Sequence, residues 1–312
     1  MGDNTRNAVL IYGCGTMGCG IACSAALAGE PVILLSRDAE KARKGVERVK
    51  GILEDMRGQS LCTEAEAAKA FGSVSAAENL ESVQNRVKLV IESVYEVMAV
   101  KQDVFTILDA ALPPEVPILS NTSGLRITDI AKNTKHPERT LTAHFWLPGN
   151  LIPFVEIVIG DNSSPEVAEK VKVCLAGWGK KPVIVKRDLP GQLAGRIFQA
   201  IIREAINIVE IGLASPEDVD TAIKMGMALR FPVWGPLEHV DAVGFDICES
   251  VQNTVLPEIS GRKDASPMFA KLRSEGRTGY KSGKGFYDWS NKDMDALLKK
   301  RNEFIIHALK KI

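Results

Sequence analysis

The sequence of 312 residues lacks an excess of charge of either sign, because 39 Lys and Arg residues balance 39 Asp and Glu residues. A chain without net charge has no general field that would draw it to nucleic acid or to an anionic membrane surface. It also lacks a hydrophobic run long enough to span a bilayer, and its polar first seven residues contain no signal-peptide core. We therefore expect neither a nucleic-acid partner nor a membrane partner.

Paired cysteines are missing as well. The six cysteines are scattered without a Cys-x-x-Cys pair, and only Cys19 and Cys23 are spaced to share one face of a helix. Two thiols with no histidine near them make a poor metal site. This pattern predicts reduced, packed thiols, a cytoplasmic protein and no bound metal.

The first 188 residues alternate between short apolar runs and helical segments. Runs typical of buried strands occupy residues 8–12, 31–35, 87–91, 116–119, 141–144, 155–158 and 181–185. Helical segments are predicted at 17–28, 39–56, 100–111 and 166–178, with a helical excursion over 57–82. Such alternation predicts an α/β domain with a doubly wound, mostly parallel sheet covered by helices on both faces.

The pattern becomes helical after the segment Arg187-Asp-Leu-Pro-Gly191. Helices are predicted over 192–213, 216–227 and 237–255. The sequence therefore predicts two domains, a Rossmann-like nucleotide-binding domain over 1–188 and an all-α domain over 189–312.

A glycine-rich loop, Gly13-Cys-Gly15-Thr16-Met17-Gly18, follows the first predicted strand and opens a helix. In this context the glycines permit a tight turn, a close approach to a pyrophosphate and close packing of the helix, whose N-terminus favours the phosphate charge. We expect these five residues (all but the cysteine) to bind a dinucleotide. A plain glycine-rich turn is the weaker alternative.

The end of the second predicted strand bears on the choice of cofactor. An acidic residue at this place binds the ribose of NAD, whereas an arginine accommodates the extra phosphate of NADP. Here the residues are Ser36, Arg37 and Asp38. Ser36 and Arg37 favour NADP, but Asp38 could still reach the ribose, so both cofactors stay open.

The chain has only four histidines, and His144 lies in an aromatic, apolar stretch twelve residues before Glu156. An imidazole that is shielded from water beside a carboxylate is suited to proton transfer near neutral pH. Taken alone, the pair describes a buried structural histidine and a strand glutamate equally well.

Several motifs resemble the 3-hydroxyacyl-CoA dehydrogenase family in order and spacing. In the first half they are Leu89-Val-Ile-Glu92-Ser-Val-Tyr-Glu96, Lys101, Ser120-Asn121-Thr122-Ser123-Gly124, His144-Phe-Trp and Glu156; in the second half they are Pro190-Gly191, residues 204–206, residues 214–224, Gly235-Pro236 and residues 279–287. The resemblance spans nearly the whole chain. It implies hydride transfer to or from NAD(P), and a homodimer that forms through the C-terminal domain.

The resemblance also implies roles for individual residues. His144 would take the proton of a substrate hydroxyl, and Glu156 would orient the imidazole. Ser123 and Asn121 would lie near the substrate and the nicotinamide. The residues that would line the cofactor cleft are Glu96 and Lys101, for which an ordinary surface pair at a helix start is an equal alternative.

Two positions depart from the family pattern. Leu147 and Gly195 stand where the family usually has asparagine. The asparagine that Gly195 replaces contributes a polar contact in the active site. Gln192 and Gln199 lie three residues before and four after Gly195, on the same helical face, so either could supply that contact.

A third departure concerns the substrate. Arg230-Phe231 stands before Gly235-Pro236, where the acyl-CoA enzymes have a short apolar link; it resembles the small-carboxylate members of the superfamily, such as gulonate, carnitine and pyridine-carboxylate dehydrogenases. A guanidinium can clamp a carboxylate through two hydrogen bonds, although an arginine here could instead bind helix-end carbonyls. Flat aromatic side chains, Trp146 among them, favour a pyridine carboxylate as substrate.

The sequence favours an NAD(P)-dependent dehydrogenase that acts on small carboxylates bearing a hydroxy, oxo or aldehyde group. Two alternatives to this function remain. One is a short-chain 3-hydroxyacyl-CoA dehydrogenase. The other is a catalytically weakened, crystallin-like structural protein, which Leu147 and Gly195 favour and which His144, Glu156 and Ser123 oppose.

Overall fold

The computed structural model describes residues 6–311. The chain forms two compact units, of which the first ends at Gly195 and the second begins at Arg196. Residues 189–195, which the sequence pattern assigns to the helical domain, lie in the first unit. Gln192 and Leu193 form hydrogen bonds with the rest of that unit.

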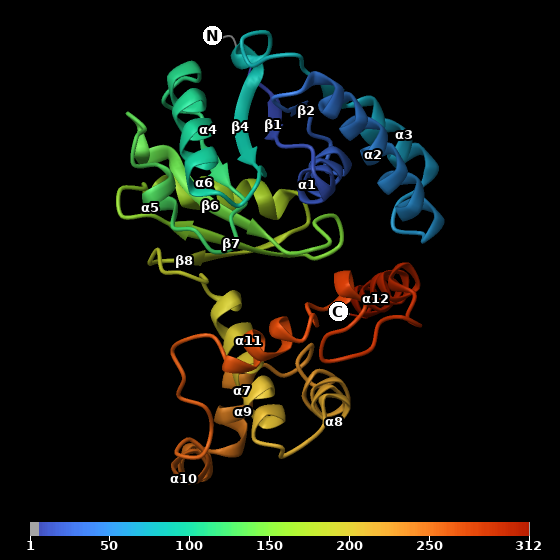
Figure 1. Ribbon diagram of the computed structural model, residues 1–312. Coiled ribbons are helices and arrows are strands. Elements are labelled where there is room, and N and C mark those ends of the chain that lie inside the picture. Colours follow the sequence, from blue (N-terminus) through green and yellow to red (C-terminus); the bar gives the residue numbers. More distant parts are fainter. Residues whose placement is uncertain (1–5, 312) are drawn as a thin grey trace. The chain divides into compact units, whose positions relative to one another are not determined.

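The first unit is built on one eight-stranded sheet with the order β3-β2-β1-β4-β5-β6-β7-β8 (Figure 1). Neighbouring strands are parallel except for β6 and β7, which are antiparallel. The strands are β1 (Ala8–Tyr12), β2 (Val32–Leu35), β3 (Val74–Ala76), β4 (Val87–Glu92), β5 (Ile118–Ser120), β6 (Thr140–Phe145), β7 (Phe154–Ile159) and β8 (Lys181–Val185). The predicted mostly parallel α/β sheet is therefore confirmed.

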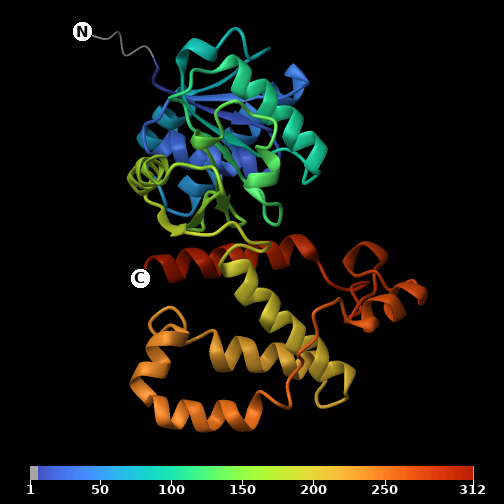
Figure 2. The ribbon, with the colours of Figure 1, turned by 90° about the vertical axis from the view of Figure 1, so that its left-hand side faces the viewer.

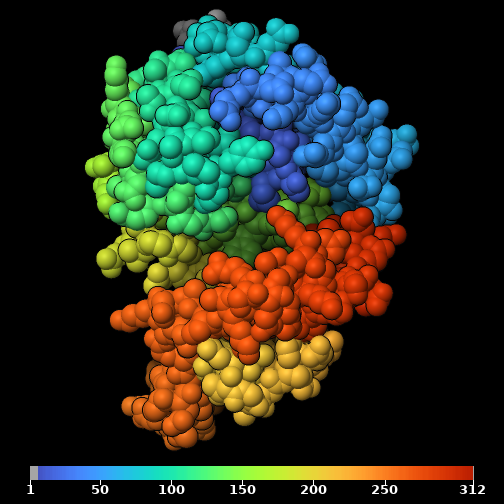
Figure 3. All heavy atoms as spheres, in the orientation of Figure 1, coloured from blue at the N-terminus to red at the C-terminus, as the bar shows by residue number. Residues whose placement is uncertain are grey.

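Helices cover both faces of this sheet. Successive residues of a strand point to opposite faces, so each buried strand packs against helices on both sides. Val9 and Ile11 of β1 pack with the helices α1, α2, α3 and α6, whereas Ala8 and Leu10 pack with α4 and α5. In Figure 3 the blue atoms of α2 and α3 and the cyan-to-green atoms of α4 lie on the face of this unit that is turned to the viewer. The helices are α1 (Thr16–Leu27), α2 (Ala39–Gly58), α3 (Glu64–Gly72), α4 (Met98–Ala111), α5 (Ile127–Ile130) and α6 (Pro165–Gly177), with 3-10 turns at Gln84–Arg86 and Pro137–Arg139.

The prediction for residues 57–82 was only partly right. The helix α3 is present, but the segment also contains β3, which pairs in parallel with β2 at the edge of the sheet. A strand of three residues, Val74-Ser-Ala76, is too short to show the alternation by which a strand is recognised in sequence.

The strand order reverses between β1 and β4, which places the glycine loop after β1 beside the end of β4. Ser93 N–H donates to Tyr12 O. In open parallel sheets, ligands bind at the carboxyl ends of the strands at such a reversal. The candidate site is therefore expected here.

The second unit is helical, and Figure 2 shows its helices in yellow to red. Its helices are α7 (Ala194–Glu210, whose first two residues belong to the first unit), α8 (Pro216–Thr221), a π-helical segment (Ala222–Met227), α9 (Pro236–Val243), α10 (Phe245–Val255), α11 (Pro267–Ser274), a 3-10 turn (Tyr280–Ser282) and α12 (Met294–Leu309). The prediction of a single helix over residues 237–255 was wrong. Gly244, with φ of 101°, separates α9 from α10 because its backbone lies outside the helical region.

The six cysteines are free thiols. Among residues 6–311, no helix is long and apolar enough to cross a membrane.

Candidate active site

The glycine loop has the shape that a dinucleotide requires. A Cβ on Gly13 would lie 2.5 Å from Ser93 O, and a Cβ on Gly18 would lie 1.9 Å from Gly13 O, so neither position admits a side chain. Space is open around Gly15, and the first turn of α1 carries neither a side-chain cap nor an acidic residue. The backbone N–H groups of Thr16 and Met17 are therefore placed to hold a pyrophosphate.

The residues after β2 include one that caps the next helix. Asp38 caps α2, because its carboxylate accepts a hydrogen bond from Glu40 N–H at 2.9 Å. Ser36 is half-buried and Arg37 is exposed at the end of β2. Asp38 thus already has a structural role, and selection between NAD and NADP by Ser36 and Arg37 stays a prediction.

His144 and Glu156 face each other across the antiparallel strands β6 and β7. His144 Nδ1 lies 2.7 Å from Glu156 Oε2, and both side chains are buried. A spacing of twelve residues brings the pair together because the chain turns back between the two strands. The bond to the carboxylate places the proton on Nδ1, so Nε2 carries the free lone pair.

Glu156 accepts four hydrogen bonds. Oε2 accepts from His144 and from Trp146 Nε1 at 3.1 Å, and Oε1 accepts from the backbone N–H groups of Leu193 and Ala194 at 2.8 Å each. Burial raises the pKa of Glu156, but the hydrogen bonds from His144, Ala194, Trp146 and Leu193 outweigh burial and hold the pKa below its ordinary value. Glu156 is therefore a fixed carboxylate anion.

Ser123 extends this pair at the other ring nitrogen, because its Oγ lies 3.1 Å from His144 Nε2. Its loop is held by Glu96, whose Oε1 accepts hydrogen bonds from Thr122 Oγ1, Ser123 N–H and Gly124 N–H at 2.5, 3.0 and 3.1 Å. Burial raises the pKa of Glu96, but the hydrogen bonds from Thr122 and Gly124, together with the charge and hydrogen bond of Lys101, lower it on balance. Ser123 thus approaches the imidazole on a braced loop.

Lys101 is a buried cation at the start of α4. Its Nζ lies 2.9 and 3.1 Å from the two carboxylate oxygens of Glu92 and 3.3 Å from Glu96 Oε2. Glu92 also accepts hydrogen bonds from Ser120 Oγ and Val94 N–H, at 2.6 Å each. Lys101 and Glu92 therefore form a buried ion pair, and Glu96, whose side chain is 44% exposed, joins this pair from the surface.

Asn121 ties the ends of three strands together. Its Oδ1 accepts from Phe145 N–H at 2.8 Å, and its Nδ2 donates to Ser93 Oγ at 3.4 Å. These bonds suit a positioning role as well as a contact with substrate.

Three further residues that the sequence assigned to substrate binding each form a hydrogen bond within the protein. Gln192 Nε2 donates to Thr122 O at 2.8 Å, next to Ser123. Trp146 binds Glu156, so its role as a substrate contact stays a prediction. Arg230 is exposed in the second unit, where its Nε donates to Gly226 O at 3.2 Å, the structural contact that was the alternative to carboxylate binding.

Sequence reasoning assigned no role to the Glu92 side chain, to Ser120 or to the N–H groups of Leu193 and Ala194. Glu92 and Ser120 each end an apolar strand with a polar residue, and that signal was available. The two backbone donors could not have been found, since every residue except proline carries the same group.

The fold and the site define a dinucleotide-binding dehydrogenase. A sequence model described as "3-hydroxyacyl-CoA dehydrogenase, NAD binding domain" matches residues 8–189, and one described as "3-hydroxyacyl-CoA dehydrogenase, C-terminal domain" matches residues 191–289. The chain therefore belongs to the 3-hydroxyacyl-CoA dehydrogenase family and is an NAD-dependent oxidoreductase.

Individual relatives span nearly the whole chain. It is 30% identical over 299 residues to the 5-formyl-3-hydroxy-2-methylpyridine 4-carboxylate 5-dehydrogenase of Mesorhizobium japonicum, covering 94% of each protein. It is 35% identical over 285 residues to a probable 3-hydroxybutyryl-CoA dehydrogenase of Bacillus subtilis, covering 91% of this chain and 98% of that one. A solved structure of a 5-formyl-3-hydroxy-2-methylpyridine 4-carboxylic acid 5-dehydrogenase, described as an NAD+-dependent dismutase, matches with a TM-score of 0.88 at 28% identity over 98% of both chains.

Proposed function

We propose that this protein transfers a hydride between NAD and the hydroxyl or aldehyde group of a small carboxylate, with a pyridine carboxylate as the preferred substrate. The observation that carries the catalytic part is the series of hydrogen bonds from Ser123 to buried His144 and from His144 to buried Glu156. The substrate class is supported by the likeness to the pyridine-carboxylate enzyme over nearly the full length of both chains.

The chain's own groups account for the movement of the proton. NAD, when bound, supplies the hydride acceptor. His144 Nε2 takes the proton from the substrate hydroxyl as the carbinol hydride leaves, and ionised Glu156 stabilises the imidazolium that forms. In the reverse direction the imidazolium returns the proton to the developing alkoxide. Ser123 Oγ–H is placed beside the same nitrogen and can donate to that oxygen.

Arg230 is the residue that we propose for the substrate carboxylate. Its Nε is engaged by Gly226 O, and the two terminal nitrogens of a guanidinium suit a carboxylate through parallel hydrogen bonds. This role rests on the small-carboxylate resemblance of the segment at Arg230-Phe231.

A short-chain 3-hydroxyacyl-CoA dehydrogenase is the second candidate, and the 35% identity to the Bacillus subtilis relative favours it. The hydrogen-bonded series of Ser123, His144 and Glu156 favours either enzyme over a crystallin-like structural role. Substrate comparison separates the two enzymes.

We expect the purified protein, supplied with NADH, to reduce an aromatic formyl carboxylate at least about tenfold more efficiently, in kcat/KM, than acetoacetyl-CoA. The physical reason is that a bidentate contact to a carboxylate contributes roughly 1.5–3 kcal/mol of transition-state binding. Products are to be measured by chromatography as well as by NADH absorbance, because a dismutase produces acid and alcohol without net change in NADH. Faster turnover of acetoacetyl-CoA would reject the small-carboxylate assignment.

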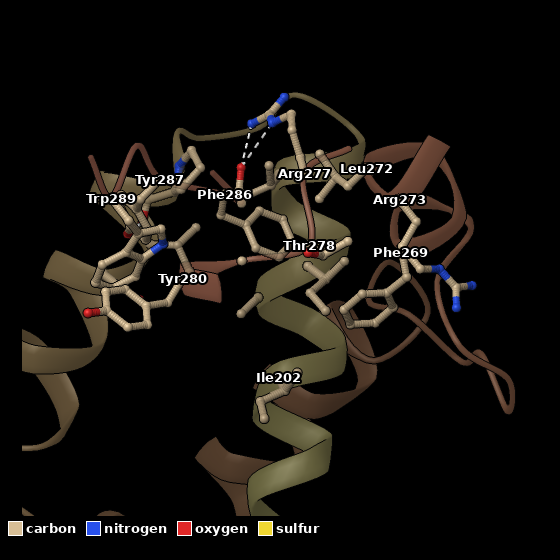
Figure 4. Close-up of a pocket in the computed structure, with 18 of the residues that line it drawn as sticks. Ile202, Phe269, Leu272, Arg273, Arg277, Thr278, Tyr280, Phe286, Tyr287 and Trp289 are labelled. Atoms are coloured by element: carbon tan, nitrogen blue, oxygen red, sulfur yellow. Dashed lines mark hydrogen bonds between the residues drawn. The ribbon is translucent and has the colours of Figure 1, made fainter. Parts of the chain in front are cut away.

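The second unit supports the proposal of a homodimer. Of its residues up to 311, only Ile206, Val219 and Ile306 are among the buried core hydrophobics, whereas it holds 21 of the 28 exposed large hydrophobic side chains found among residues 6–311. Figure 4 shows an apolar groove within this unit, lined in part by Ile202, Phe269, Leu272, Tyr280 and Phe286 and about 790 Å³ in volume. Apolar surface on this scale is typical of an interface, and a second copy of the chain is the occupant that the family resemblance implies.

Light scattering is expected to give twice the chain mass of 33.9 kDa. Phe245→Glu on α10, where the side chain is 69% exposed, should shift the mass toward the monomer because a charge cannot be buried unpaired. Val173→Glu on α6, equally exposed at 72%, is the matched control in the first unit. A monomeric wild-type protein would refute the dimer.

A further inference from the structure

We propose that Gln192 Oε1 accepts a hydrogen bond from a bound ligand and thereby selects ligands that carry a neutral donor beside the reacting group. The donor is either a ring hydroxyl of the substrate or the carboxamide N–H of the nicotinamide. The proposal rests on the proposed function, since it places this ligand beside Ser123 and His144.

The backbone of Gln192 is held in an unusual conformation. Its φ is 53°, in the left-handed region that few residues other than glycine adopt, and Gly191 before it has φ of 79°. Strain of this kind persists where surrounding contacts impose it, and it is concentrated at functional sites. Here Gln192 N–H donates to Leu189 O.

Hydrogen bonds on both sides of Gln192 fix the segment to the first unit. Before it, buried Asp188 accepts from Thr128 N–H and Oγ1 at 2.8 and 2.6 Å. After it, the N–H groups of Leu193 and Ala194 bind Glu156. The left-handed turn therefore sets the direction of the Gln192 side chain.

Only one end of the Gln192 carboxamide forms a hydrogen bond. The residue is 5% exposed, and Nε2 donates to Thr122 O at 2.8 Å. Among the residues that the structure describes, only Gln192 Oε1 and Thr142 Oγ1 are buried side-chain polar atoms without a hydrogen-bond partner. A buried acceptor without a donor is costly, and native proteins rarely keep one without a role.

Gln192 lies next in sequence or by hydrogen bond to residues that contact Ser123 and Glu156. Gln192 binds the carbonyl of Thr122, the residue before Ser123, and it precedes Leu193, which binds Glu156. The carboxamide thus bridges the Ser123 loop and the segment that holds Glu156. Leu189 and Leu193 on either side of it are exposed at 40% and 43%, so this buried oxygen belongs to a turn whose flanking side chains are at the surface.

The chemistry of the oxygen defines the group that it recognises. With Nε2 engaged, the carboxamide offers only an acceptor, so a hydroxyl or an amide N–H binds and a carboxylate or carbonyl does not.

Two pairs of probes distinguish the sources of the donor. The first pair is NAD and 3-acetylpyridine adenine dinucleotide, in which a methyl group replaces the carboxamide NH2. The second pair is an aromatic formyl carboxylate with and without a ring hydroxyl beside the reacting group. Dissociation constants are measured by calorimetry for the cofactors alone, and with cofactor bound for analogues of the aromatic pair in which a methyl group replaces the formyl group, so that no turnover occurs.

We expect wild-type protein to bind the donor-bearing member of one pair about tenfold more tightly, as one hydrogen bond would give. Gln192→Met, which has similar length but no acceptor, should reduce that preference to about one. Gln84→Met is the matched control, because Gln84 lies in the 3-10 turn before β4, at the opposite end of that strand from Glu92, and it should keep the wild-type preference.

The pair that responds identifies the donor. A wild-type protein without preference in either pair, or a Gln192→Met protein that keeps the preference, would overturn the proposal. Thermal unfolding of each variant shows whether loss of the Thr122 bond has altered folding. Because binding is measured without catalysis, failure of this proposal is distinguishable from failure of the proposed reaction.

Discussion

Replacement of His144 by asparagine is expected to lower kcat by about 10²–10⁴-fold, the usual contribution of a positioned general base. The amide nitrogen of asparagine can take the place of Nδ1 and donate to Glu156 Oε2, which His144 does at 2.7 Å. The change therefore removes Nε2, the atom that faces Ser123 Oγ, while it leaves the buried carboxylate with a donor. Steady-state kinetics with NAD and the substrate chosen above measure the effect.

His136→Asn is the matched control, because His136 is an exposed histidine beside Glu138, outside the site. It should keep wild-type kcat. The His144→Asn protein should bind NADH with wild-type affinity and unfold within a few degrees of the wild-type temperature. A kcat that stays within about threefold of wild type would exclude His144 as the base.

Lys101→Met is expected to lower the free energy of unfolding by about 3–5 kcal/mol, since breaking a buried ion pair leaves an uncompensated charge. The Lys101 side chain is 1% exposed, and its partner Glu92 is fully buried. Without the ammonium, Glu92 and the nearby Glu96 lose the cation between them. Urea unfolding followed by circular dichroism measures the change.

A double variant tests this explanation. Lys101→Met together with Glu92→Gln removes the unpaired charge, so it should be less destabilised than the sum of the two single variants. Lys172→Met removes an exposed lysine that lies 3.8 Å from Glu169, and it should leave stability nearly unchanged. Strict additivity in the double variant would show that charge is not the cause of the loss.

Parts of the site that depend on side-chain type and chain order were predictable. The loop from Gly13 to Gly18 was recognised because only glycine fits the contacts with Ser93 O and Gly13 O. The pair of His144 and Glu156 was recognised because few histidines compete with it. The role of Lys101 was left open between a surface pair and a cleft residue, because local sequence does not show how deeply a lysine at a helix start is buried.

The sequence by itself determined the α/β alternation, the glycine loop and the two residues that we propose as the proton-transfer pair, because each depends on local pattern or on residue chemistry. Only the tertiary structure decided that β6 and β7 run antiparallel, so that His144 and Glu156 meet across them. It also decided that Leu193 N–H, 37 residues beyond Glu156, binds that carboxylate, and that one end of the Gln192 carboxamide lacks a partner. Backbone donors are alike in every residue but proline, and burial depends on distant segments, so neither is determined by local sequence.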